Sequence, residues 1–145
     1  MPEEEIYLEQ AIRTHLLNDA VLASYLGDEA VYFSTLPNDA ALPAIVIQEI
    51  SAVDPAPTHS GHSGIENRRF QLTIFADCVH KRVRIKTRLD RYLNNRNVVV
   101  GQAAGSDGVW CPRISKANQT DLGLDPGRRL FMYAMDFIFT EKVQP

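Results

Sequence analysis

The chain has 145 residues, of which 45% are apolar and 23% charged, and its formal net charge is −3. This length and composition suit one globular unit, so we predict a single domain over residues 1–145. The acidic balance disfavours a general nucleic-acid-binding protein, which usually has a basic domain. No apolar run approaches the roughly 18 residues that span a bilayer.

Two further features bear on the compartment. The N-terminus begins Met1-Pro2-Glu3-Glu4-Glu5 and lacks the basic and apolar regions of a signal peptide, so we expect a cytoplasmic product. Cys78 and Cys111 are the only cysteines, which is too few for a disulfide framework.

The first elements expected are two short helices. Pro2 and the glutamates suit a first helical turn, where the helix dipole favours negative charge. An apolar face then recurs at helical spacing through Leu8, Ile12, His15 and Leu16. Asn18-Asp19 ends this helix and caps a second over Ala20–Leu26, which Gly27 ends.

The middle of the chain predicts three strands and a loop. Val31–Phe33 is a short strand, and Leu42–Ile50 is a second, interior one, because Ala44–Ile47 is apolar on both faces. Ala52–Gly64 is rich in Pro, Gly, His and Ser, so we expect a long loop that a partner orders. In the next strand, Arg68–Asp77, one face is apolar: Phe70, Leu72, Ile74 and Ala76.

The second half predicts a helix followed by short strands. Asp77 caps a helix that ends at Asn94-Asn95, with its buried stripe at Ile85, Leu89, Tyr92 and Leu93. Val98–Val100 and Val109–Ser115 are expected strands, and Gln119–Gly127 is expected to be a second long loop. The closing strand is the strongest, with Phe131, Tyr133, Met135, Phe137 and Phe139 all on one side.

Helices at one end, then mostly strands, predict an α+β fold. We expect an antiparallel (mixed) β-sheet packed by an N-terminal helix and one long central helix, with long loops.

The chain offers little catalytic chemistry. His59-x-x-His62 with Cys78 and His80 has poor spacing for zinc, and Cys78 beside His80 has no third group to orient a base. Phosphate-binding glycine loops, Ser-containing elbows and HExxH are absent from the sequence. We therefore expect no catalytic residue, no cofactor and no metal site, and a protein that is not an enzyme.

Basic charge is concentrated in the expected central helix. The segment 81–96 holds seven of the 15 Lys and Arg residues and one acid. Arg84, Arg88 and Arg91 fall on one helix face, away from the apolar stripe. This row could be a solvated face, could pair with an acidic surface of a neighbouring subunit, or could contact nucleic-acid phosphates.

Two arginine pairs stand at expected strand starts. Arg68-Arg69 follows the first long loop, and Arg128-Arg129 follows the second, which also contains Asp125. Loops of this composition often gain structure on assembly, so we predict subunit or partner contacts at these residues.

Read in order, these motifs resemble the tail-completion, or tail-terminator, family of long-tailed bacteriophages and prophages. The resemblance covers roughly residues 5–140. It rests on the order and spacing of short motifs. In the first third of the chain these are Leu8-x-x-Ala11-Ile12-x-x-x-Leu16-Leu17, Asp19-Ala20-x-Leu22-Ala23, Leu26-Gly27-Asp28 and Val31-Tyr32-Phe33. Further along they are Leu42-Pro43-Ala44-Ile45-Val46-Ile47-Gln48 with Ile50-Ser51, Arg69-Phe70-Gln71-Leu72-Thr73-Ile74-Phe75-Ala76 with the helix to Leu93, and the closing segment Asp121–Asp136 with Arg129, Tyr133 and Asp136.

The resemblance implies a structural virion protein. Such a terminator forms a hexameric ring on the last tail-tube ring, stops tube polymerisation and joins the tail to the head connector protein. It would lie at the head-proximal end of the tail after assembly in the host cytoplasm. Its partners would be further copies, the tail-tube protein and the connector, while genomic DNA passes the lumen without sequence-specific binding and no membrane is involved.

Two alternatives share the same residues. One is a head-completion or connector adaptor of the virion. The other is a nucleic-acid-binding accessory protein that uses the basic helix 81–96.

Overall fold

The computed structural model describes residues 8–26, 30–53, 65–101, 108–125, 127 and 129–142. Four predictions lie outside them: the helix start at residues 2–5, the stop at Gly27, most of the Ala52–Gly64 loop, and Arg128. The elements are α1 (Leu8–Asn18), α2 (Ala20–Leu26), β1 (Val31–Phe33), β2 (Ala44–Val53), β3 (Ile65–Ala76), α3 (Val79–Leu93), β4 (Arg96–Val100), β5 (Val109–Asp125) and β6 (Leu130–Lys142).

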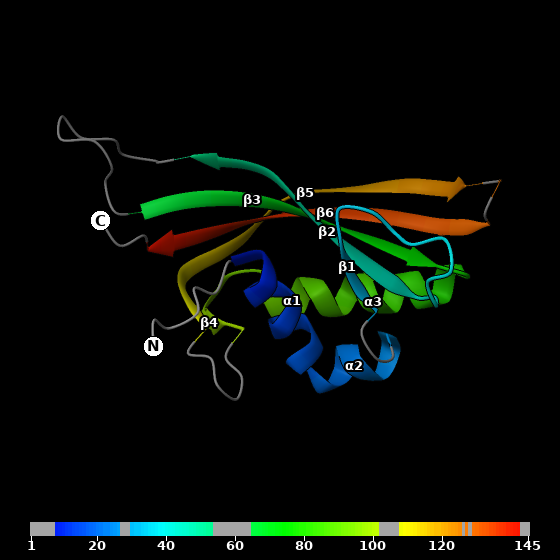
Figure 1. Ribbon diagram of the computed structural model, residues 1–145, viewed down its shortest axis with the longest axis horizontal. Coiled ribbons are helices and arrows are strands. Elements are labelled where there is room, and N and C mark those ends of the chain that lie inside the picture. The colour runs from blue at the N-terminus through cyan, green and yellow to red at the C-terminus, as the bar shows by residue number, and fades with distance from the viewer. Residues whose placement is uncertain are drawn as a thin grey trace.

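The strands form one curled sheet in the order β1-β2-β3-β6-β5-β4. β1 pairs with β2 in parallel and every other pairing is antiparallel, so the sheet is mixed. Figure 1 shows the long strands running along the molecule with the helices gathered on one side of the sheet. The α+β prediction with a mixed sheet is confirmed.

The core lies between the sheet and the helices. Phe70, Leu72 and Ile74 of β3 pair across the strands with Phe137, Met135 and Tyr133 of β6, which places both sets on one face. The helices cover that face with buried side chains at helical spacing: Leu8, Ile12 and Leu16 from α1, and Ile85, Leu89 and Leu93 from α3. Burying each such side chain stabilises the fold by about 1.5–3 kcal/mol.

The predicted loop over Gln119–Gly127 is wrong for its first seven residues, because residues 119–125 belong to β5. They pair with β6 from Gln119↔Met135 to Asp125↔Leu130. Two register shifts, between Lys116 and Asn118 and between Asp121 and Gly123, let the strand continue past residues that favour turns. Gly123 adopts a φ of 77° at the second shift, a conformation that glycine allows.

Three other boundaries differ from prediction. Ala52 and Val53 belong to β2 and not to the loop, and Arg68 and Arg69 lie inside β3, which starts at Ile65. Asp77 does not cap α3, because Cys78 occupies the N-cap position without a side-chain hydrogen bond. The Asp77 carboxylate instead lies 3.1 Å from the Lys81 ammonium.

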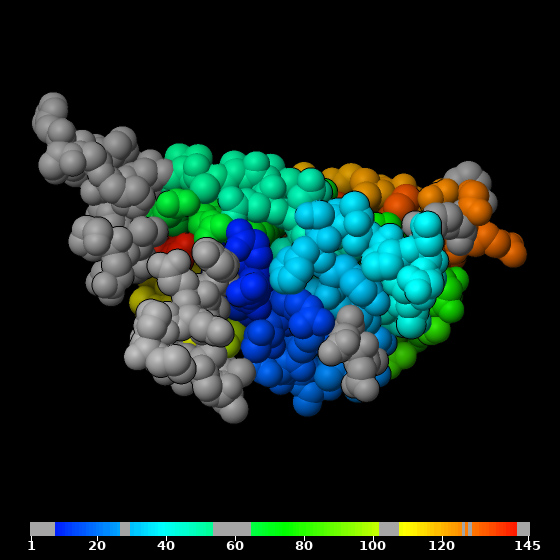
Figure 2. All heavy atoms as spheres, viewed as in Figure 1, coloured from blue at the N-terminus to red at the C-terminus, as the bar shows by residue number. Residues whose placement is uncertain are grey.

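The sheet has two distinct ends. Ile65 of β3 pairs with Lys142, whereas Ala76, at the other end of β3, pairs with Phe131. The end of β2 and the start of β3 therefore lie at one end of the sheet, and the end of β5 and the start of β6 lie at the opposite end, as Figure 1 shows. We call these the β2–β3 end and the β5–β6 end. In the space-filling view the β5–β6 end projects beyond the body formed by α1, α2 and the segment after β1 (Figure 2).

Candidate functional site

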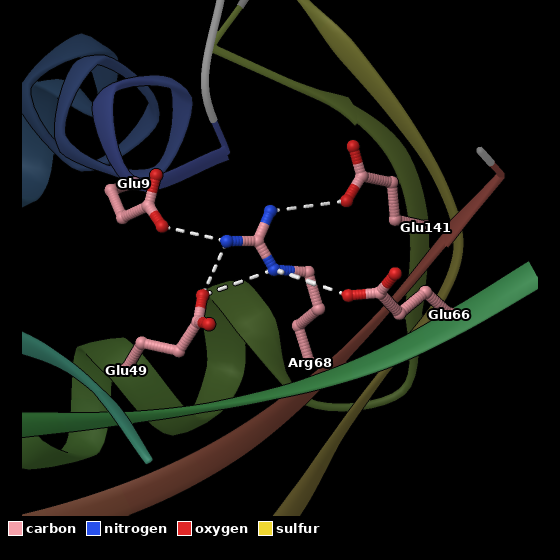
Figure 3. A network of polar contacts seen from close by, with 5 residues as sticks. All are labelled: Glu9, Glu49, Glu66, Arg68 and Glu141. Carbon is pink, nitrogen blue, oxygen red and sulfur yellow. Dashed lines mark hydrogen bonds and ion pairs between the residues drawn. The ribbon is translucent and has the colours of Figure 1, made fainter. Parts of the chain in front are cut away.

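Arg68 lies at the centre of a charge cluster at the β2–β3 end of the sheet (Figure 3). Its guanidinium donates hydrogen bonds to Glu9 of α1 at 2.6 Å, to Glu141 of β6 at 3.2 Å and to Glu49 of β2 at 3.0 Å through Nε. Glu66 lies 4.0 Å from the same Nε. We call these five residues the Arg68 cluster. It joins α1 to three neighbouring strands.

The cluster is tightly enclosed around its single cation. The Arg68 side chain is 16% exposed, and its guanidinium also lies 5.3 Å from the centre of the Phe70 ring. Burial disfavours the charged form, but hydrogen bonds to Glu49 and Glu141 outweigh it and raise the pKa of Arg68. The cation is therefore held permanently by partners within the chain.

Arg69 points to the opposite face of the sheet. It donates to the buried carboxylate of Asp136 on β6, with Nε 3.0 Å from Oδ2. Gln71 and Thr73 follow Arg69 on this helix-free face and are half-buried. The ion pair leaves this part of the face without net charge.

Arg88 ties α3 to the junction of α1 and α2. It makes two hydrogen bonds of 2.7 Å to the two oxygens of Asp19, whose side chain is 7% exposed. Asp19 also accepts a hydrogen bond from the backbone N–H of Leu22, so it caps α2 as predicted. The hydrogen bonds from Arg88 lower the pKa of Asp19 more than its burial raises it.

Arg84 and Arg91 differ from Arg88, because no carboxylate pairs with either in the part of the chain that the structure describes. The Arg84 guanidinium lies 4.4 Å from the centre of the Tyr25 ring of α2. Both arginines are exposed and border a hollow of about 290 Å³ between α2 and α3. The structure therefore splits the predicted arginine row into one internal ion pair and two open cations.

The β5–β6 turn holds the remaining candidates. Asp125 closes the turn by accepting a hydrogen bond from the Gly127 N–H at 3.0 Å. Arg129 precedes β6 in a left-handed conformation with φ of 53°. Beside them, Leu122 and Leu124 are nearly half exposed. This end therefore presents apolar side chains together with charges.

The described part of the chain has few side chains that could bind a metal or take part in redox chemistry. No three His, Cys, Asp or Glu residues there are arranged to hold a metal, and His59 and His62 lie outside the described part. Burial raises the pKa of Cys111 to about 12, which keeps its thiol protonated and inert. None of the described helices is long and apolar enough to span a bilayer.

Sequence reasoning missed the acidic members of these networks. Glu9, Glu49 and Glu141 are far apart in sequence from one another and from Arg68, and only the strand register and the position of α1 bring them together. Glu66 lies two residues before Arg68 on the same strand. Asp19 was predicted as a cap, but its pairing with Arg88 depends on how α3 packs on α2. No local pattern signals the contacts of Arg68 with Glu9, Glu49 and Glu141 or the contact of Arg88 with Asp19.

The described residues thus form a mixed sheet covered by helices on one face, with charged and exposed apolar side chains at both ends of the sheet and between α2 and α3. A family model described as Tail completion protein gp17 matches residues 10–88, more than half of the chain. The chain belongs to this family and is a bacteriophage tail-completion protein, a structural component of the virion.

A comparison with solved structures identifies a similar fold. A chain in the virion of a native gene transfer agent (GTA) particle is similar, with a TM-score of 0.67 and 18% identity, covering 95% of this chain and 95% of that chain. At this identity the similarity shows the fold alone, and it spans α1 to β6. No curated protein sequence matches the chain.

Proposed function

We propose that this protein is a tail terminator. Copies of it form a ring, six in number, on the last ring of the tail tube at its head-proximal end, stop tube polymerisation and join the tail to the head connector. The match to the tail-completion family over residues 10–88 carries this proposal. The whole chain, residues 1–145, acts as one terminator domain and performs no catalysis.

The two ends of the sheet support a joining role. Ile50, Val53 and Ile65 are exposed at the β2–β3 end, and Leu122 and Leu124 are exposed at the β5–β6 end. A subunit with apolar contacts at both ends of a stiff sheet can bind one partner at each end. Tube protein and connector are the two partners that a terminator needs.

The candidate residues divide between these contacts. Asp125, Arg128 and Arg129 serve the β5–β6 end, and Arg68 and Arg69 serve the β2–β3 end by holding its strands in register. Arg84 and Arg91 face a neighbouring copy, and Arg88, paired with Asp19, lies between them on the same surface. The ion pair between Arg69 and Asp136 neutralises one positive charge on the helix-free face, along which the DNA would pass.

The direct test is tube capping. Purified protein is added to polymerising tail-tube protein, and tube length and tube ends are measured by electron microscopy. We expect shorter tubes that carry a ring at one end. Tubes that grow unchanged, with the protein bound instead to isolated connectors, would contradict the terminator and favour the adaptor.

Mass measurement provides a second readout. Light scattering over a range of protein concentrations should give a hexamer, or a monomer that forms rings only on tube ends. A stable monomer or dimer that ignores tube ends would contradict the proposal.

A further inference from the structure

The outer side of α2 and α3 carries a groove that would face a neighbouring copy in the proposed ring, and the proposed function leaves open which segment fills it. Its floor is apolar, with Val21 and Tyr25 from α2 and Val83 from α3. Val83 is 46% exposed and Val21 is 37% exposed, although both lie between two helices. Figure 1 shows α2 lying beside α3 on the side of the helices away from the sheet.

The groove continues past Tyr25 and Arg84, which line two adjoining hollows of about 290 and 200 Å³. The second hollow adds Ser24, Pro43 and Lys81. We call the combined surface, from Arg91 to Lys81, the α2–α3 groove.

Positive charge borders the groove and is only partly neutralised. Lys81 pairs with Asp77, and Arg88 pairs with Asp19. Arg84 and Arg91 have no carboxylate partner among the described residues, so the groove keeps two open cations beside an apolar floor. A surface of this kind fits a segment that combines acidic and apolar side chains.

The chain itself contains such a segment. Its first residues read Met1-Pro2-Glu3-Glu4-Glu5-Ile6-Tyr7, three acids followed by two large apolar side chains. No other run of three consecutive acids occurs in the sequence. The three glutamates are opposite in charge to Arg84 and Arg91, and the two apolar side chains suit the apolar floor of the groove.

Geometry favours a groove on another copy. α1 has 11 residues and separates Leu8 from α2, a length of about 16 Å at 1.5 Å per residue. Seven extended residues reach at most about 25 Å, so the segment would have to run back along its own helix to fill its own groove. A segment that extends from Leu8 away from α1 is available to an adjacent subunit.

We propose that the α2–α3 groove of one copy binds the acidic N-terminal segment, Glu3 to Tyr7, of the next copy in the ring. The contact joins two different surfaces, so it repeats head to tail and closes a ring. This inference rests on the proposed ring and names the contact that holds neighbouring subunits together.

Charge exchange tests this contact. Three variants are compared with the wild type: Arg84→Glu with Arg91→Glu, Glu3→Lys with Glu4→Lys and Glu5→Lys, and the chain that carries all five changes. Assembly is measured by light scattering across protein and salt concentrations, alone and with tube protein. Far-UV circular dichroism and urea unfolding establish that each variant is folded.

We expect each reversal alone to raise the protein concentration needed for assembly by about tenfold or more, and the combined variant to recover to within about threefold of the wild type. The loss should be smaller at high salt, where exposed charges are screened. Recovery of assembly by the second set of charges is a result that misfolding of the first variant cannot produce.

Other outcomes separate the hypotheses. If the wild type caps tubes and all three variants do so equally, the groove contact is wrong and the terminator function stands. If the wild type neither assembles nor caps tubes, both are wrong. If the groove variant is not rescued and instead loses salt-sensitive binding to a 20-base-pair DNA duplex, the groove binds nucleic acid and the proposed contact is overturned.

Discussion

The Arg68 cluster and the α2–α3 groove use the same side chain in opposite ways. Arg68 is enclosed by Glu9, Glu49, Glu66 and Glu141, so carboxylates of the same chain neutralise its charge. Arg84 and Arg91 lie open beside apolar side chains with no carboxylate partner among the described residues.

The difference separates stability from assembly. An arginine whose guanidinium N–H groups are hydrogen-bonded within the chain stabilises the fold, so replacing it lowers the free energy of unfolding. An exposed arginine beside a groove, with no carboxylate partner among the described residues, contributes little to folding, so replacing it weakens binding to a partner instead. Each prediction below checks on which side of this division a residue falls.

The largest effect is expected at Arg68. Arg68→Met removes the guanidinium to which Glu9, Glu49 and Glu141 are hydrogen-bonded, and we expect the free energy of unfolding to fall by about 2–4 kcal/mol. This is below the value for a fully buried pair, since the four carboxylate side chains are 20–34% exposed. Urea unfolding at pH 7 measures the loss.

Arg68→Lys is the matched control. It keeps the charge but cannot donate to Glu9, Glu49 and Glu141 in the same geometry, so it should fall between the wild type and Arg68→Met. An ordinary surface substitution changes the free energy of unfolding by about 0.5 kcal/mol or less. If Arg68→Met stays within that range of the wild type, the Arg68 cluster contributes no more to stability than ordinary surface charges do.

The next largest effect is expected at Asp19. Asp19→Asn keeps a helix cap but removes the charge that holds Arg88, and we expect a loss of about 1–3 kcal/mol at pH 7. The loss should depend on pH, because the folded-state pKa of Asp19 lies below its ordinary value of 3.8, chiefly through the hydrogen bonds from Arg88.

The lowered pKa of Asp19 determines how stability changes with pH. The stabilisation by the Asp19–Arg88 pair is complete above the unfolded pKa near 3.8 and is lost as the pH falls through the lower folded value. Wild type and Asp19→Asn should therefore converge in stability below pH 3.8. A difference that stays constant between pH 7 and that range would show that Asp19 acts only as a cap.

Particular residues show how far the sequence could predict this arrangement. The spacing of apolar residues predicts both the type of element and its buried face. Helical spacing relates Ile85, Leu89 and Leu93, and the two-residue spacing of a strand relates Phe70, Leu72 and Ile74. They predicted α3, β3 and the α+β class, and the structure confirms them.

The failures have one physical origin, which is pairing over long sequence distances. Residues 119–125 look like a turn because of Gly123, but pairing with β6 keeps them extended. Likewise, the helical pattern makes Arg84, Arg88 and Arg91 look equivalent. Only the packing of α2 against α3 brings Asp19 within hydrogen-bonding distance of Arg88 and leaves Arg84 and Arg91 with no carboxylate partner among the described residues.

A smaller effect on stability is expected in the groove. Arg84→Gln with Arg91→Gln removes the contact of Arg84 with Tyr25, and we expect a loss of about 0.5–1 kcal/mol. Assembly should weaken far more than folding. Thermal unfolding and light scattering on the same sample measure both, and a fall in stability as large as that of Arg68→Met would remove the distinction between the two regions.

The smallest effect on stability is expected at the β5–β6 end. Leu122 and Leu124 are exposed by nearly half, so Leu122→Ser with Leu124→Ser should change the free energy of unfolding by less than about 0.5 kcal/mol per site. Tube capping or connector binding should nevertheless fall, because the double change removes apolar surface from one end of the sheet.

Ile50→Ser with Val53→Ser, at the opposite end of the sheet, is the matched pair. If one end meets the tube and the other the connector, the two double variants should each lose a different partner in co-sedimentation with tubes and with connectors. Loss of the same partner from both would mean that the sheet lies flat on a single surface, and a joining role for its two ends would then be untenable.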